Sequence, residues 1–336
     1  MKEGRNSNFE ILRIVAILMI TAYHYVVHGV ADPNGGGGIL LNVCSLWGKA
    51  GVNIFCLLTG YMLVCKPQID YKRLKTVEFQ VLFYTLTGLV AGYLTHHSIG
   101  FGNIIKSVFP VVFEHYWYVT AYVIVFLLSP YLNKMLRNIE QKDFAKLLII
   151  CFIVWSVIPF FTAREHSGLY WNQFIWFVVM YLTGAYIRLT NHRYSRRCYI
   201  NAFWISSLLL VLSVVVIEWL AHYNARFSPY ITYFRWSNSP LIVITCFALM
   251  RIAAMSKQRS VGWINFVASL VFGIYLFQEN VFYRDILWQD LLNNTTPTTQ
   301  PQLAAHIFLS ILAVVVIGGV IDYIRIKIFK ILRLSK

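Results

Sequence analysis

Hydrophobic residues occupy this chain in long stretches, separated by short polar segments. Each stretch has about 20 residues, which is the length that an α-helix needs to cross the hydrocarbon core of a bilayer. We therefore predict about ten membrane-spanning helices. Their approximate ranges are 9–28, 42–64, 76–96, 115–133, 146–163, 170–188, 200–220, 238–255, 262–283 and 303–325.

The composition favours a membrane protein over a soluble one. Hydrophobic residues make up 58% of the chain and charged residues 13%, with a mean hydropathy of +0.60, whereas soluble proteins have about 25% charged residues. The stretches follow one another with short loops, which leaves no room for a separate soluble module. We expect one all-α polytopic membrane helix bundle, a single domain over residues 1–336.

The positive charges predict the orientation of the bundle. If both termini are cytoplasmic, all but six of the 29 Lys and Arg residues fall in inner segments, as the positive-inside rule requires. The net charge of +15 is thus spread over many loops, where it contacts lipid head groups, and a nucleic-acid partner is disfavoured. The six outer residues are Lys49, Lys106, Arg164, Arg226, Arg235 and Arg284.

Other features of the sequence agree with a bundle that begins at the first stretch. That stretch holds charged residues and no small-residue cleavage site, so it is predicted to be retained. The six cysteines show no C-x-x-C spacing and are interpreted as small apolar residues. Turn residues between the stretches predict loops, at Asp32-Pro33-Asn34, the glycines 35–38, Lys66-Pro67, Asn238-Ser239-Pro240 and 293–297.

Arg13 and His24 are the strongest functional signal. They lie eleven residues apart in the first span, which on a helix is about 20° beyond three full turns and about 16 Å along the axis. Both side chains therefore face the same way. Ionisable groups at that depth are costly unless they face a cavity or a partner, so the pair is a functional hypothesis.

Each residue of this span also has an alternative interpretation. His24 is suited to act as a general base near neutral pH, or it hydrogen-bonds a neighbouring helix. Arg13 is suited to bind phosphate or carboxylate, or it pairs with Glu10. His28 shares the face of His24, but no third ligand accompanies them within the span, so we predict no metal.

A second basic group, Lys72, Arg73 and Lys75, follows the second span on the inner side. These residues are interpreted either as a site for the phosphates of a nucleotide-like donor or as ordinary topology determinants.

Several stretches, in order, resemble the acyltransferase 3 family, the integral-membrane O-acyltransferases of bacterial surface glycans. The R-x10-H spacing of Arg13 and His24 matches the family signature, and Lys72 to Lys75 stands where the family has basic residues. The other matching stretches are Gly51-Val52-Asn53-Ile54-Phe55, Leu57-Leu58-Thr59-Gly60-Tyr61, Tyr116-Trp117-Tyr118, Leu127-Leu128-Ser129-Pro130 and Phe272-Gly273-Ile274-Tyr275-Leu276.

The chain departs from the family pattern at a few of these places. Asn53 stands where an acidic residue is frequent, Thr59 where Ser is frequent, and Gln278 where His is frequent. Lys72 and Lys75 keep the positive charge but lack the bidentate fork of arginine.

The resemblance implies transfer of an acetyl group from cytoplasmic acetyl-CoA to a hydroxyl of a cell-surface polysaccharide or its undecaprenyl-linked precursor, in the bacterial cytoplasmic (inner) membrane. It implies His24 as the general base, by direct attack or through an acyl-His step. Glu279 is suited to orient His24, because a carboxylate partner fixes the ring tautomer, or it is a polar group at a helix end on the outer surface. The residues expected to bind the donor are Arg13, Lys72, Arg73 and Lys75, and Asn53 is a candidate for substrate binding. Trp117 and Tyr118 are suited to shape the acyl or sugar pocket, or they are anchors at the bilayer interface.

Two rival functions are a transporter or flippase of lipid-linked sugars or acyl groups, and a glycan polymerase that uses no CoA. A transporter is favoured by internal repeats, and none is evident in the sequence. A polymerase is distinguished by activity in membranes depleted of acetyl-CoA.

Overall fold

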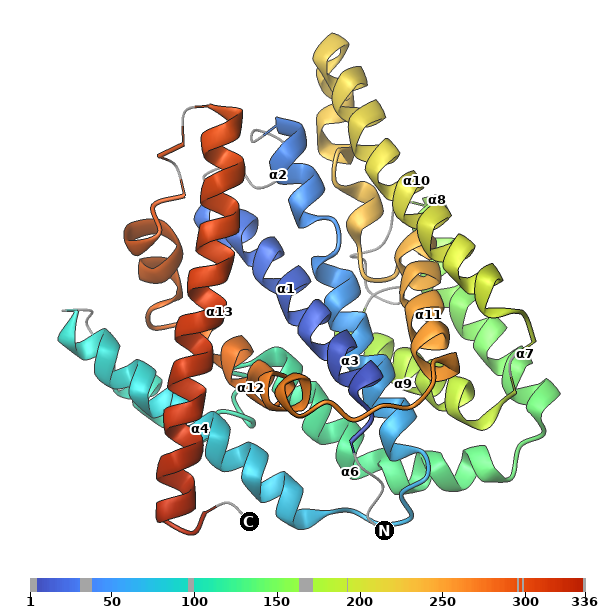
Figure 1. Cartoon of the computed structure of the whole chain (residues 1–336), viewed down its shortest axis with the longest axis horizontal. Coiled ribbons are helices and arrows are strands. Elements are labelled where there is room, and N and C mark those ends of the chain that lie inside the picture. Colours follow the sequence, from blue (N-terminus) through green and yellow to red (C-terminus); the bar gives the residue numbers. More distant parts are fainter. Residues whose placement is uncertain are drawn as a thin grey trace.

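The computed structural model of the chain describes residues 5–30, 38–95, 100–162, 172–191, 193–294, 296–297 and 299–334, and these contain helices and no strands. The predicted all-α class is therefore confirmed for this part of the chain (Figure 1). The α-helices are α1 (Ser7–Gly29), α2 (Gly38–Ser45), α3 (Gly48–Leu63), α4 (Tyr71–Leu94), α5 (Phe101–Val108), α6 (Trp117–Arg137), α7 (Gln141–Phe152), α8 (Ile158–Thr162), α9 (Gln173–Leu189), α10 (Arg196–Tyr223), α11 (Pro240–Met255), α12 (Gly262–Gln278) and α13 (Gln300–Ile331). Short π- and 3₁₀-helical turns are η1 (Ile153–Val157), η3 (Ala225–Tyr230), η4 (Tyr233–Arg235) and η5 (Ile286–Leu291).

Eight helical segments of the described chain are long and apolar enough to cross a membrane, so the protein is a multi-pass membrane protein. Two further apolar helices, α9 and α12, have 17 residues each. At about 1.5 Å per residue they extend about 26 Å, less than the hydrocarbon core of about 30 Å. The predicted count of about ten spans is thus not confirmed, because two of the ten apolar stretches form helices shorter than the apolar run.

Capping side chains set where several helices begin. The Asn6 side chain accepts a hydrogen bond from the backbone of Asn8 and caps α1, and the Asp70 side chain accepts one from the backbone of Arg73 and caps α4. Each cap satisfies a backbone donor that a helix start would otherwise leave unpaired. The predicted turn at Lys66 falls between α3 and α4, whereas Asp32-Pro33-Asn34 lies outside the described residues.

The central element of the bundle is α1. It packs against α3, α11, α12 and α13, which surround it in Figure 1. Around α1 the buried apolar side chains form a continuous core that includes Ala16, Ile54 and Leu57, none of which is more than marginally exposed. The helix that carries Arg13 and His24 is therefore enclosed by other helices over much of its surface.

Helices α3 and α9 pack tightly, and their backbones nearly touch at two glycines. A Cβ placed on Gly60 would lie 1.9 Å from the carbonyl oxygen of Tyr181, and one on Gly184 would lie 2.0 Å from that of Leu57. Small residues let membrane helices approach in this way.

The beginning of α1 and the end of α13 lie at the same end of the molecule, the lower end in Figure 1. This agrees with an even number of crossings. That this end is cytoplasmic stays a prediction of the charge distribution.

Gly60→Ala is expected to destabilise the bundle, because the added methyl forces α3 away from α9. Overpacking of this kind costs about 1–3 kcal/mol. Thermal unfolding of the detergent-purified protein, followed by size-exclusion chromatography with fluorescence detection, would show a lower transition temperature. The control is Gly102→Ala, where an added Cβ has no neighbour within 4 Å. Equal transition temperatures for the two variants would show that the α3–α9 contact is not tight.

The orientation can be tested with a native thiol. Cys65 and Cys198 are the exposed cysteines of the described chain, and in a Cys65→Ser background we expect Cys198 to resist a membrane-impermeant maleimide in intact cells. It should react once the membrane is opened, since the start of α10 is predicted to be cytoplasmic. The control for the outer side is Arg226→Cys in η3, which should react in intact cells. The opposite labelling pattern would reverse the orientation.

Candidate active site

One large cavity follows α1 along almost its whole length. Its volume is about 1180 Å³ and its lining includes both Asn6 and His28, positions separated by about 33 Å of helix. The rest of its wall comes from α3, α4, α6, α9, α11 and α12 and from the segments that follow α3, α11 and α12. Arg13 and His24 both line it, so the prediction that they face the same way is confirmed.

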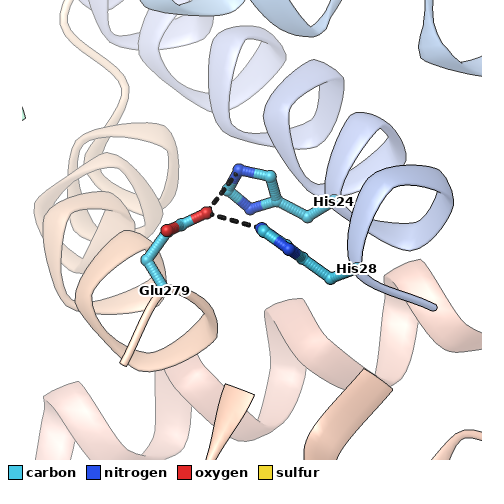
Figure 2. Close-up of side chains that lie close together, drawn as sticks. All are labelled: His24, His28 and Glu279. Carbon is cyan, nitrogen blue, oxygen red and sulfur yellow. Dashed lines mark hydrogen bonds and ion pairs between the residues drawn. The ribbon is translucent and has the colours of Figure 1, made fainter. Parts of the chain in front are cut away.

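At one end of the cavity, His24 and His28 converge on a single carboxylate oxygen (Figure 2). The Nε2 atom of His24 lies 2.8 Å from Oε1 of Glu279, and Nε2 of His28 lies 2.9 Å from the same oxygen. The two histidines are one helical turn apart on α1, which places them on one face. Glu279 comes from the far end of the sequence, where it follows the last residue of α12.

The neighbour of Glu279 fixes the position of this carboxylate. Asn280 is fully buried, and its side-chain amide donates hydrogen bonds to the backbone oxygen of Tyr84 and to the hydroxyl of Tyr116. These contacts tie the end of α12 to α4 and to the start of α6. The other carboxylate oxygen, Oε2, faces Arg284 at 3.7 Å, so Glu279 has a cation on one side and two imidazoles on the other.

The hydrogen bonds define which nitrogen of His24 is free. If Nε2 carries the ring proton and donates it to Glu279, the lone pair is on Nδ1. Nδ1 is buried and has no hydrogen-bond partner in the described part of the chain. His24 therefore offers a base whose orientation is held by a carboxylate, the arrangement that general-base histidines use.

The other end of the cavity is strongly basic. Five cationic side chains line this end. Among the described residues that line it, the one carboxylate is Glu10, which pairs with Arg13 at 2.7 Å and with Arg5 at 3.2 Å. The predicted alternative for Arg13 is thus also observed, since Arg13 both pairs with Glu10 and faces the cavity. The five cations are Arg5, Arg13, Lys66, Arg73 and Arg188.

Of the second basic group, only Arg73 reaches the cavity. Arg73 and Arg13 both lie near Tyr122 of α6, whereas Lys72 does not line the cavity and Lys75 points along α4 toward the ring of Phe79. Successive residues of a helix are about 100° apart, so neighbouring side chains cannot all face one side. The structure does not bring Lys72 or Lys75 to the cavity.

Asn53 is also outside the cavity. It is fully buried, its amide donates to the backbone oxygen of Ser237 at 2.7 Å, and its carbonyl oxygen accepts from Trp176 at 2.9 Å. These bonds join α3 to α9 and to the segment before α11. The arrangement gives Asn53 a structural contact and no contact with the predicted site.

Aromatic rings line the middle of the cavity, between its two ends. Trp117 and Tyr118 are both part of the wall, and the Tyr118 ring packs edge to face against Tyr275 of α12 with 5.8 Å between ring centres. Tyr275 was missed by reasoning from the sequence, although it stands in the stretch that resembles the family. The sequence could have indicated Tyr275 because it lies four residues before Glu279, a spacing that places both side chains on the same helix face.

Tyr23 and Lys49, which also line the cavity, were missed as well. Tyr23 precedes His24, and its ring has the Nζ of Lys49 at 4.9 Å and the guanidinium of Arg235 at 5.5 Å from its centre. The sequence could have indicated Lys49 because it is one of the few cations predicted to lie on the outer side.

His115 offers no competing base. It lies in the segment before α6 and does not line the cavity. Burial, together with the charge of Lys106, lowers the pKa of His115 to about 4, so it carries little basicity near neutral pH.

Comparison with known proteins agrees with this geometry. The family model described as acyltransferase domain, that of the acyltransferase 3 family, matches residues 6–322. Comparison with curated proteins and with solved structures gives no match. The matched range contains both ends of the cavity, including the His24–Glu279 pair. The chain therefore belongs to the acyltransferase 3 family, and it is a multi-pass membrane acyltransferase.

Proposed function

We propose that the protein is an O-acetyltransferase of the bacterial inner membrane. It moves an acetyl group from cytoplasmic acetyl-CoA to a hydroxyl of a surface polysaccharide or of its undecaprenyl-linked precursor. The observation that carries this proposal is that one cavity has five cations at one end and His24 bonded to Glu279 at the other.

The basic end suits the phosphates of CoA. Arginine binds phosphate through paired hydrogen bonds, and Arg13, Arg73 and Arg188 all face this space. Among the described residues that line this end, Glu10 is the one carboxylate beside five cations, so their summed charge is positive. A donor held by its phosphates at Arg13 has about 16 Å of cavity in which to extend its arm and thioester toward His24.

The reaction at His24 is direct transfer. The acceptor hydroxyl gives its proton to Nδ1, the hydroxyl oxygen bonds to the thioester carbonyl carbon, and the carbon–sulfur bond breaks. The proton then passes from His24 to the sulfur of CoA. Glu279 holds the ring and stabilises the imidazolium that forms between these steps. An acyl-His intermediate is the alternative route.

The acceptor binds beside Trp117 and Tyr118. Aromatic faces suit the apolar faces of sugar rings, and both residues line the cavity between its two ends. Lys72, Lys75 and Asn53 have no part in this proposal because they lie outside the cavity.

His24→Ala is expected to abolish acetyl transfer, because removal of a general base lowers the rate about 10²–10⁴-fold. The measurement is transfer of radiolabelled acetyl from acetyl-CoA to endogenous glycan in membranes with matched protein levels. Equal labelling by the variant would remove His24 as the base. Absence of labelling with both proteins would favour a transporter.

Glu279→Gln in the same assay distinguishes a positioning role from a structural one. The amide keeps the shape but not the charge, so we expect a lower kcat and a changed pH profile with an unaltered KM for acetyl-CoA. A variant with the wild-type pH profile would leave Glu279 without a role in orienting His24.

Arg73→Gln is expected to raise the KM for acetyl-CoA about tenfold to a hundredfold, because hydrogen bonds to charged groups contribute about 1.5–3 kcal/mol. Lys75→Gln, on the outside of the same helix, is expected to change the KM less than about twofold. The control is Lys142→Gln in the first turn of α7, where the side chain is exposed and pairs with Glu140. A larger effect at Lys75 than at Arg73 would contradict the proposed donor site.

A further inference from the structure

The cluster of His24, His28 and Glu279 has a second chemical capacity besides proton transfer. The sequence offered no third metal ligand within the first span, but folding supplies one from a position 251 residues further along the chain. We infer that these three side chains form a binding site for a divalent transition-metal ion such as Zn²⁺, and that the bound ion inhibits the enzyme.

The geometry of the ligand atoms supports the site. One ligand atom from each of the three residues lies within 4.8 Å of the other two. Zinc binds histidine nitrogen and carboxylate oxygen at about 2.0–2.2 Å, so an ion between these atoms needs only small side-chain movements. The histidines are at i and i+4 of α1, which directs both rings to one point.

The surroundings leave room for the remaining ligands. All three residues line the cavity, so a water molecule or a substrate oxygen can complete a four-coordinate site. Arg284 approaches Oε2 of Glu279, and the ion would use Oε1, which faces both histidines. Two imidazoles and one carboxylate prefer zinc, nickel or copper over magnesium or calcium.

The same surroundings indicate an exchangeable ion. Histidines that hold a resident metal usually donate the second ring nitrogen to an acceptor, and Nδ1 of His24 has no partner in the described part of the chain. The ring is thus held by Glu279 and not by a second hydrogen bond. We expect reversible binding that follows the free metal concentration.

Inhibition follows from the ring tautomer and depends on the proposed function. A metal at Nε2 of His24 requires the ring proton to be on Nδ1. The lone pair that would accept the hydroxyl proton is then lost, and Glu279 is occupied by the ion. Both changes stop proton transfer without displacing the donor from the basic end.

The test is a titration of the purified full-length protein with Co²⁺, which reports its ligands by visible absorption. Cys65 and Cys198, the exposed thiols, are replaced by Ser so that they do not bind metal. We expect a saturable spectrum with one ion per chain, displaced by Zn²⁺. His28→Ala should weaken binding at least about tenfold. The control is His222→Ala on α10, an exposed histidine outside the cavity, which should bind as before.

Transfer activity provides the second measurement. Zn²⁺ should inhibit acetyl transfer by the parent protein, and EDTA should restore it. The residual activity of His28→Ala should be at least about tenfold less sensitive to Zn²⁺.

Size-exclusion profiles establish that the variants are folded, and His28→Gln is used in place of His28→Ala if that variant does not fold. Co²⁺ binding that survives in His28→Ala would overturn the site, and so would absence of a saturable spectrum. Because the spectrum needs no turnover, failure of the proposed transferase activity leaves the metal test intact.

Discussion

The cost of an ionisable group inside a membrane is the constraint on which this structure depends. His24 and Arg13 stand on a mostly apolar helix, and each must have a partner or a polar space. The protein provides both, because Glu279 bonds to His24 and Glu10 bonds to Arg13 at opposite ends of one cavity. The helices around α1 are arranged so that these four side chains share that space.

The packing of the other helices keeps the cavity open. On the side of α3 and α9, backbone contact at Gly60 and Gly184 and the hydrogen bonds of Asn53 hold two helices tightly together. On the side of α12, Asn280 ties the end of the helix to its neighbours. The walls are therefore fixed by contacts that lie outside the cavity, which leaves its lining free for ligands.

The charge distribution gives the cavity a direction. Its basic end suits a polyanionic donor, and the His24–Glu279 end suits proton transfer; the aromatic rings lie between them. The proposed transfer from a cytoplasmic donor to an acceptor in or across the membrane needs such a path through apolar surroundings. The same convergence of two imidazoles on one carboxylate that positions a base also creates a set of metal ligands, since both tasks require nitrogen and oxygen lone pairs at short range.

The sequence by itself determined the helical class, the approximate places of the apolar helices and the common face of Arg13 and His24, because these follow from local periodicity and from the length of apolar runs. It also carried the family, through motifs spread along the chain. It did not determine which of Lys72, Arg73 and Lys75 faces the cavity, that Asn53 is a structural contact, or that α9 and α12 are short helices. Nor did it show that Glu279 bonds to both His24 and His28. Only the tertiary structure decided these points, because each depends on the rotation and depth at which helices far apart in sequence pack together.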